Sequence, residues 1–131
     1  MILIKTKIGK SKINGLALFA AQDIPKGTVI WRFNPQLDLR LSEEEVQLLP
    51  DVVKWNYKHY CFKSKRSDKY ILCFDDTRFM NHSNNPNIIN EPRHDDEGEN
   101  CDIAFVDIKS GEEIVGDYKS FDADYKWKMS N

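Results

Sequence analysis

The stretch Asn81-His82-Ser83-Asn84-Asn85-Pro86-Asn87 constrains the fold most, because it is too polar and too rich in turn-forming residues for an ordinary strand or helix. Asn and Ser side chains hydrogen-bond to nearby backbone, while Pro86 fixes its own φ and pushes Asn85 towards an extended conformation. The stretch therefore predicts an irregular but anchored loop, a frequent location for functional sites. The simpler alternative is a long Asx-type turn between two strands. Asn81-His82-Ser83 also fits a glycosylation sequon, which requires a secreted protein.

The chain of 131 residues has the length of one ordinary domain, which can bury a core without disulfides or a structural metal. We expect a single domain over residues 1–131. No apolar run approaches the length of a signal peptide or a membrane span. The sequence therefore predicts a cytoplasmic protein that does not contact membranes and does not use the sequon.

The three cysteines, Cys61, Cys73 and Cys101, are odd in number, widely spaced and without a CxxC motif. This usage is typical of a reducing compartment. A zinc site built from His59, Cys61 and Cys73 is an alternative, but it lacks a recognisable zinc knuckle. We expect buried, inert thiols and no metal.

The formal net charge of −2 lacks the basic excess of a nucleic-acid-binding protein, so we expect no direct nucleic-acid partner. The acidic residues are nevertheless concentrated in one loop, from Glu91 to Asp102, where Arg93 is the only basic residue apart from a histidine. Such a loop can attract a cationic peptide. A solvated loop without a partner is the simpler interpretation.

Short strand patterns dominate the chain, and one helical region interrupts them. Ser42 followed by Glu45 forms a capping box, Pro50 marks a helix end, and a second short helix follows it. The predicted strands or hairpin arms cover residues 2–8, 15–20, 28–33, 60–62, 70–74, 88–89 and 103–106; the second helix covers 51–59 and a helical turn 75–80. The fold class is therefore mostly β with a small helical insert, and no βαβ alternation supports a doubly wound nucleotide fold.

One turn sequence occurs twice. Asp107-Ile108-Lys109-Ser110-Gly111 repeats the pattern of Asp23-Ile24-Pro25-Lys26-Gly27 far along the chain. Two similar turns are implied, because stacked repeats require three or more units.

Three segments carry a family resemblance when they are taken together. They are Gly15 to Ala20, Arg78 to Asn87, and Gly111-Glu112-Glu113-Ile114-Val115-Gly116-Asp117-Tyr118. In this order and spacing they resemble the SET-domain protein lysine methyltransferases, from about Ile4 to Tyr118. The resemblance implies a β-clip-like fold of small curved sheets with a C-terminal pseudoknot, in which the polar loop is held by side-chain hydrogen bonds.

The resemblance also implies a cofactor, S-adenosylmethionine, with S-adenosylhomocysteine as the product. The chain departs from the family at Ala17, which replaces the second glycine of the usual Gly-x-Gly and adds a methyl group. His82 is expected to act as a structural imidazole or through its backbone rather than as a base. The residues that match cofactor-contact positions are Gly15, Leu16, Ala17, Arg78, Phe79, Asn81 and His82, together with Tyr118.

Tyr118 matches the family's catalytic tyrosine, whose hydroxyl orients the amine and the methyl group. The family transfers the methyl group to the neutral form of a lysine amine, which a narrow apolar channel favours by lowering the pKa of the amine. We expect Trp31, Tyr70 and Phe121 to line this channel. The alternative for Tyr118 is a strand-end tyrosine that packs its ring.

The chain lacks the cysteine-rich segment with which many relatives close the site. Residues 119–131 form the expected closing segment, with Trp127 as the first aromatic residue to cover the adenine; simple packing on the body is the alternative. Residues 38–69 occupy the position of the family's variable substrate-reading insert and are short. The resemblance therefore implies a minimal member of the family.

The predicted function is methyl transfer from S-adenosylmethionine to the lysine ε-amine of a protein or peptide. The acidic loop suggests a basic substrate, such as a histone-like tail, a ribosomal protein or a translation factor. The alternative is a catalytically impaired SET-fold module that binds a lysine-bearing peptide or the cofactor without transfer. The sequence does not predict the oligomeric state.

Overall fold

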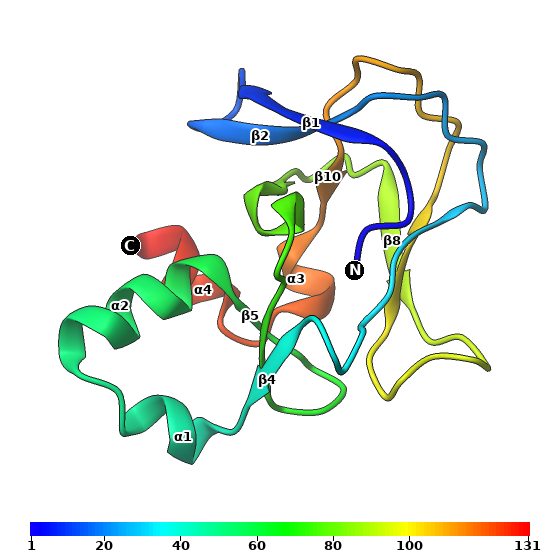
Figure 1. Cartoon of the computed structure of the whole chain (residues 1–131). Coiled ribbons are helices and arrows are strands. Elements are labelled where there is room, and N and C mark those ends of the chain that lie inside the picture. Colours follow the sequence, from blue (N-terminus) through cyan, green and yellow to red (C-terminus); the bar gives the residue numbers. More distant parts are fainter.

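Ten short strands form four separate sheets in the computed structural model, which describes residues 1–131 (Figure 1). The strands are β1 (Thr6–Lys10), β2 (Leu16–Ala20), β3 (Val29–Trp31), β4 (Leu39–Leu41), β5 (Phe62–Lys63), β6 (Tyr70–Leu72), β7 (Asn81–His82), β8 (Ile88–Glu91), β9 (Cys101–Ala104) and β10 (Val115–Gly116). The helices are α1 (Glu43–Gln47), α2 (Asp51–Tyr60), the 3₁₀ turn η1 (Asp76–Phe79), α3 (Tyr118–Phe121) and α4 (Tyr125–Ser130). The predicted class, mostly β with a small helical insert, is confirmed. No helix combines the length and apolar composition needed to cross a bilayer.

The predicted strand over residues 2–8 is divided in the structure, because its first residues pair with β3 and the later ones pair with β2. Strand β1 therefore begins at Thr6 rather than at residue 2. The hairpin β1–β2 is antiparallel, with Gly9 opposite Ala17. Before it, Ile2 forms an isolated bridge to Trp31, and its N–H donates to Asp75 Oδ2 at 2.7 Å. The predicted alternation still sets the packing, because Ile2, Ile4 and Ile8 lie against the core.

The two turns with similar sequences, residues 23–27 and 107–111, contact each other. Ile24 and Ile108 exchange both backbone hydrogen bonds, at 2.7 and 2.8 Å. Asp107 accepts a hydrogen bond from the N–H of Lys26, and Asp23 accepts one from the N–H of Ser110. The repeated sequence thus forms a reciprocal pair of turns, in which each aspartate caps the opposite turn.

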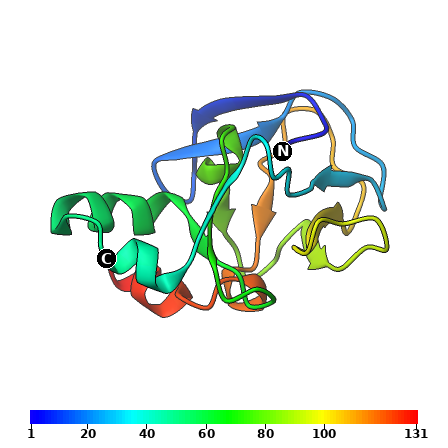
Figure 2. The ribbon, with the colours of Figure 1, turned by 60° about the horizontal axis from the view of Figure 1, so that its bottom comes forward.

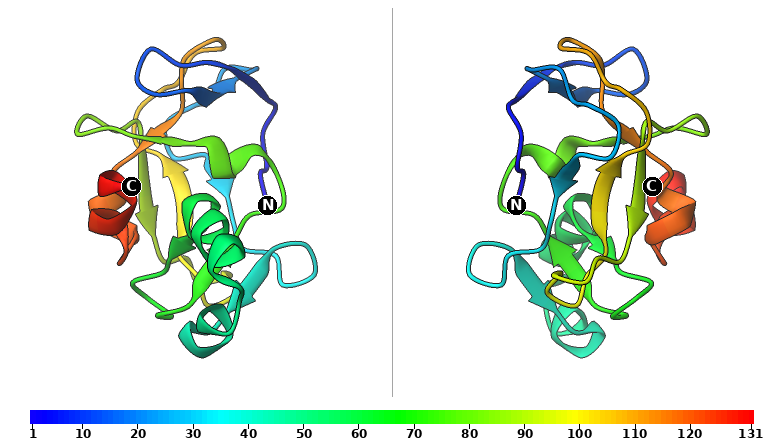
Figure 3. Two further views of the ribbon diagram at one scale, coloured as in Figure 1. Left: turned by 90° about the vertical axis from the view of Figure 1, so that its left-hand side faces the viewer. Right: turned by 90° about the vertical axis from the view of Figure 1, so that its right-hand side faces the viewer.

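The central sheet has the strand order β3-β9-β8 and supports the main core (Figure 3). All four residues of β9 are buried, so this strand contributes side chains on both of its faces. One face contributes Ile88 and Ala104 to a core of nine buried residues, which also includes Leu18, Ile30 and Ile114. This core fixes the strands that carry the functional residues.

The helical insert forms as its end signals predict. The Ser42 hydroxyl accepts from the N–H of Glu45, and the Glu45 carboxylate accepts from the N–H of Ser42, which completes the capping box. Helix α2 follows Pro50, and β5 and β6 form the expected hairpin. Helices α1, α2 and α4 gather on one side of the molecule, away from the β1–β2 hairpin (Figure 2).

The polar segment, residues 81–87, is partly a strand, and here the expectation of a loop throughout is wrong. Asn81 and His82 pair in parallel with Val115 and Gly116. The loop was predicted because these residues are polar. In the structure their side chains form hydrogen bonds with other segments, and their backbone pairs with β10. The remainder crosses over β10 and is fastened at both ends, through Ser83 N–H to Gly116 O and Asn87 N–H to Val115 O.

The side-chain amide of Asn87 forms hydrogen bonds with the backbone of residues 113 and 115, as the peptide group of a neighbouring strand would. Its Nδ2 donates to Glu113 O at 2.8 Å, and its Oδ1 accepts from Val115 N–H at 2.9 Å. Replacing Asn87 by Ala leaves both backbone groups without partners, so we expect the free energy of unfolding in urea to fall by about 2 kcal/mol. Asn85→Ala is the control, because the Asn85 side chain is exposed and makes no hydrogen bond. Equal stability of the two variants would contradict this role.

Candidate functional site

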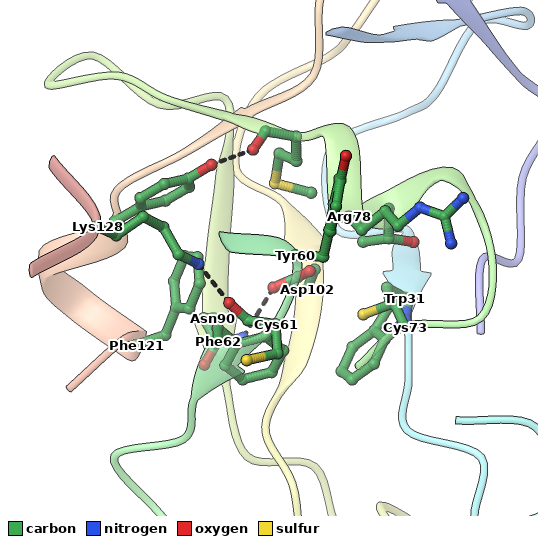
Figure 4. A pocket seen from close by; sticks show the side chains of 13 residues that line it. Trp31, Tyr60, Cys61, Phe62, Cys73, Arg78, Asn90, Asp102, Phe121 and Lys128 are labelled. Carbon is green, nitrogen blue, oxygen red and sulfur yellow. Dashed lines mark hydrogen bonds between the residues drawn. The ribbon is translucent and has the colours of Figure 1, made fainter. Parts of the chain in front are cut away.

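Two cavities meet at one wall, and this wall carries the predicted catalytic residue. The wide cavity has a volume of about 440 Å³, and the narrow cavity has a volume of about 40 Å³. Both are lined by Tyr60, Arg78, Met80, Tyr118 and Lys128. Figure 4 shows the narrow cavity, with Tyr60, Arg78 and Lys128 labelled. These five residues therefore border a group in either cavity.

The wide cavity contains most of the residues predicted to contact a cofactor. Gly15, Leu16, Phe79, Asn81 and His82 line it in addition to the shared wall. Gly15 has a positive φ of 49°, and no atom lies within 4 Å of the position that a Cβ would occupy, so its backbone faces open space. The size and the mixed lining fit a nucleoside-sized ligand.

A hydrogen-bond network holds the edge of the wide cavity. Asn81 Nδ2 donates to Asn14 O and to Glu113 Oε1, both at 3.0 Å. The Ser11 hydroxyl lies 3.0 Å from both oxygens of the same carboxylate. The predicted amide donor of Asn81 thus binds the glycine turn, and its Oδ1 is the atom left for a ligand. Glu113, which sequence reasoning quoted only as part of a motif, has a positioning role.

His82 is held as a neutral acceptor at Nδ1. The backbone N–H of Tyr118 donates to Nδ1 at 3.1 Å, and a backbone N–H can only donate. Nδ1 therefore carries no proton, and its 3.7 Å separation from Asp117 is not an ion pair. The other nitrogen, Nε2, lies 3.2 Å from Asn84 Oδ1 and acts as the donor. His82 thus fixes the start of α3, and it has no free nitrogen to serve as a base.

Tyr118 lies at the N-terminus of α3, with its hydroxyl directed to the polar segment. The hydroxyl donates to Met80 O, which lies just before β7. Burial raises the pKa of Tyr118, so the hydroxyl keeps its proton at neutral pH. The ring packs edge-on against Phe121 at 5.7 Å. Tyr118 is therefore a fixed, protonated donor and cannot be a phenolate base.

The narrow cavity is lined mainly by aromatic and sulfur-containing side chains, with a polar part. Trp31 and Phe62 meet edge-on at 6.1 Å, and Phe121 lies on the other side of Phe62 at 5.5 Å. The polar part consists of Asn90 and Asp102, whose side chains are joined by a hydrogen bond of 2.8 Å. Two of the three residues predicted for the channel, Trp31 and Phe121, line this cavity.

The thiols that line the narrow cavity are held in the protonated form. Burial raises the pKa of Cys61 to about 12 and raises that of Cys73 well above its ordinary value. All three cysteines are buried and free. No group of three histidine, cysteine or acidic side chains converges in a geometry for a metal ion.

Lys128, from α4, forms part of the shared wall. Its Nζ pairs with the buried Asp122 at 3.0 Å, donates to Cys61 O and lies 5.2 Å from the centre of the Tyr118 ring. No sequence pattern indicates this residue, because its role depends on how α4 docks. The helix therefore closes the site with a salt bridge as well as with apolar side chains.

Three predicted site residues do not line either of the two cavities. Ala17 is fully buried in β2, so the methyl group that distinguishes it from glycine is enclosed by the protein and is not exposed to a ligand. The Tyr70 hydroxyl donates to Asp124 at 2.6 Å, and its ring packs with Val46 and Cys61. Trp127 contacts His59, with ring centres 4.9 Å apart, and lies under Lys58. Of the C-terminal residues after Lys128, Met129 and Asn131 line the wide cavity.

Tyr60 is the main aromatic residue that sequence reasoning missed. It ends α2 and lines both cavities, with Phe79 edge-on at 6.3 Å and the Arg78 guanidinium 5.8 Å from its ring centre. The predicted helix ended one residue earlier and assigned Tyr60 to a strand. Helical spacing places Tyr60 on the same face as Asn56 and Tyr57, and the docking of α2 against η1 brings this face to the site.

Arginines neutralise much of the acidic loop. Asp95 pairs with Arg32 at 2.8 Å, Asp96 with Arg66 at 2.7 Å, and Glu99 with Arg40 at 3.0 Å. These arginines lower the pKa of Asp95 and of Asp96. The loop is therefore fastened to the body, and Glu91 and Glu97 are its exposed acidic side chains without an ion pair.

The fold and the paired cavities define a class of protein, and the comparisons with known proteins identify it. The family model of the SET domain matches residues 15–119. The chain therefore belongs to the SET-domain family. A comparison with curated proteins found no match.

Solved structures share this fold. A candidate histone methyltransferase of Plasmodium falciparum is 23% identical, with a TM-score of 0.61, and the match covers 89% of this chain and 95% of that one. A Chaetomium thermophilum Polycomb Repressive Complex 2 structure bound to an inhibitor is 24% identical, with a TM-score of 0.65 and coverage of 90% and 15%. The same complex bound to S-adenosylmethionine in an autoinhibited conformation is 22% identical, with a TM-score of 0.68 and coverage of 97% and 16%. The chain thus spans about a sixth of the Polycomb chain.

Proposed function

We propose that this protein transfers a methyl group from S-adenosylmethionine to the ε-amine of a lysine in a protein substrate. The observation that carries the proposal is the wall shared by the two cavities, with Tyr118 in it. The wide cavity has a volume suited to the cofactor, and the narrow one has the mainly apolar lining suited to the end of a lysine side chain. The family match and the solved structures of the same fold support this chemistry.

The residues of the wide cavity fit S-adenosylmethionine, which supplies an electrophilic methyl carbon on a positively charged sulfur. The backbone of Gly15 and Leu16 borders the open space, and Asn81 Oδ1 is available as an acceptor for an amino group. Arg78 and Phe79 form the opposite side, and His82 contributes through its backbone. Met129 and Asn131 close the end of the cavity in place of Trp127.

The side chains of this protein have two tasks in such a transfer. The first is to favour the neutral amine, because deprotonating a free lysine at pH 7 costs about 4 to 5 kcal/mol. The apolar surfaces of Trp31, Phe62 and Phe121 disfavour the charged form. The second task is alignment, which Tyr118 performs from a position fixed by Met80 O and by His82.

The test uses S-adenosylmethionine labelled on its methyl group, with core histones and a mixed protein lysate as acceptors. We expect calorimetry to detect cofactor binding and acid hydrolysis of the labelled protein to yield methylated lysine. Absence of cofactor binding would contradict the proposal. If another side chain carried the label, methyl transfer would be supported but lysine would not be the acceptor.

The rival function, a SET-fold module that binds without transfer, receives less support from the structure than from the sequence. Ala17 favoured this rival in the sequence, but Ala17 is fully buried and does not line the wide cavity. Its second argument was the missing cysteine-rich closure, yet Lys128 and Met129 of α4 line the site. Cofactor binding without transfer to either acceptor preparation would favour this rival.

We further propose a cytoplasmic location and a basic protein substrate, such as a histone-like, ribosomal or translation protein. Three free, buried cysteines support a reducing compartment. The support for a basic substrate is the histone methyltransferase named among the solved structures, together with Glu91 and Glu97. The arginine pairs of the acidic loop reduce the charge available for such attraction.

A further inference from the structure

Asp102 is the one buried acidic side chain without a cationic partner. Four acidic residues of the chain are buried, and the other three each pair with a cation within 3.0 Å: Asp38 with the amino group of Met1, Glu99 with Arg40, and Asp122 with Lys128. The carboxyl group of Asp102 makes a single hydrogen bond, accepted by Oδ1 from Asn90 Nδ2 at 2.8 Å. Burying a carboxylate without a counter-charge lowers the stability of the fold, so we expect this residue to serve a function.

The unpaired carboxyl group lies at the narrow cavity. Asp102 is in the middle of β9, between Asn90 on β8 and Trp31 on β3, and all three line the cavity (Figure 4). Trp31 Nε1 is also buried without a partner. The cavity of about 40 Å³ has room for only a few water-sized groups. Tyr118 and Asp102 both line this small cavity, so a ligand that fills it is bordered by both residues.

Few charges face Asp102. The amino group of Met1 lowers the pKa of Asp102, and Cys73 and Cys101 are its titratable neighbours. Arg78 and Lys128 are the cationic side chains that line the same cavity, and neither forms an ion pair with Asp102. Burial raises the pKa of Asp102 to about 6, which brings it closer to that of a desolvated amine.

We propose that Asp102 receives the ammonium group of the target lysine and accepts the proton that must leave before methyl transfer. This inference rests on the proposed function. In the step, an N–H bond of the ammonium group breaks, an O–H bond forms on Asp102, and the nitrogen keeps the electron pair with which it attacks the methyl carbon. Asp102 returns the proton to water when the product leaves. Asn90 holds the carboxyl group in position.

The first test needs no knowledge of the substrate, because n-butylammonium has the same atoms as a lysine side chain. It is titrated into the ¹³C-labelled protein at pH 7.5, with butan-1-ol as the uncharged control ligand. We expect a saturable shift of the Asp102 carboxyl signal, and an affinity at least about tenfold lower in Asp102→Asn. Glu99→Gln, which also replaces a buried carboxylate, should bind like the wild type. An unchanged Asp102 signal, or equal affinity in Asp102→Asn, would overturn the proposal.

The second test is the pH dependence of kcat/KM with core histones as acceptor. Asp102→Asn should lower kcat/KM on the order of 100-fold at pH 7, and the deficit should shrink towards pH 9.5, where more substrate is already neutral. A deficit that is constant with pH would indicate a merely structural effect and would overturn the proposal. If wild-type protein neither binds S-adenosylmethionine nor labels histones, the proposed function fails. The butylammonium titration still decides the role of Asp102.

Discussion

Tyr118→Phe is expected to lower the rate of methyl transfer by at least about 100-fold, because a small misplacement of reacting groups costs that much. The variant removes the hydroxyl group that holds Tyr118 to Met80 O and leaves the ring between Phe121 and His82. The affinity for S-adenosylmethionine should change by less than about threefold, because the cavity wall keeps its shape. Single-turnover transfer and calorimetry measure the two effects separately.

Tyr125→Phe is the matched control for this experiment. Tyr125 begins α4, lines neither cavity and makes no side-chain hydrogen bond, so its variant should keep the wild-type rate. Thermal denaturation of both variants shows whether the fold survives. Tyr118→Phe with the wild-type rate would remove the hydroxyl group from the mechanism, and equal loss in both variants would indicate a general disturbance of the C-terminal segment.

Asp102→Asn is expected to make the protein more stable at neutral pH. The pKa of Asp102 is raised to about 6 in the folded state, so folding favours its protonated form. The contribution of the protonated carboxyl group to the free energy of unfolding is fully present below pH about 4 and is lost as the pH rises through 6. At pH 7 the free energy of unfolding of the wild type is therefore lower by about 2 to 3 kcal/mol than it would be with Asp102 protonated. The amide cannot ionise and can still accept the hydrogen bond from Asn90, so the variant avoids this loss.

Urea denaturation at a series of pH values measures this effect. The difference between Asp102→Asn and the wild type should be largest above pH 7 and should disappear near pH 4. Glu99→Gln is expected to have the opposite sign at pH 7, because it leaves Arg40 without its partner. A variant that is less stable than the wild type at pH 7 would contradict the prediction. A gain in stability together with a loss of transfer is the pattern expected of a functional residue.

Local sequence determined those features that depend on neighbouring residues. The capping box at Ser42, the end of α1 before Pro50 and the β5–β6 hairpin follow from interactions over a few positions. The order of the three motif segments was sufficient to predict the family, the fold and the position of Tyr118. Each motif is contained in a short stretch, and their order along the chain can be read without knowledge of the tertiary structure.

Tertiary structure alone decided which side chains surround the site. Tyr60 and Tyr70 are both aromatic residues near the end of a predicted element, but the docking of α2 brings Tyr60 to the cavities and leaves Tyr70 bound to Asp124. The pair Asn90–Asp102 exists because of the register between β8 and β9. The arginines that neutralise the acidic loop come from positions at least thirty residues away in the sequence. Such contacts depend on the packing of whole elements, on which local sequence patterns carry no information.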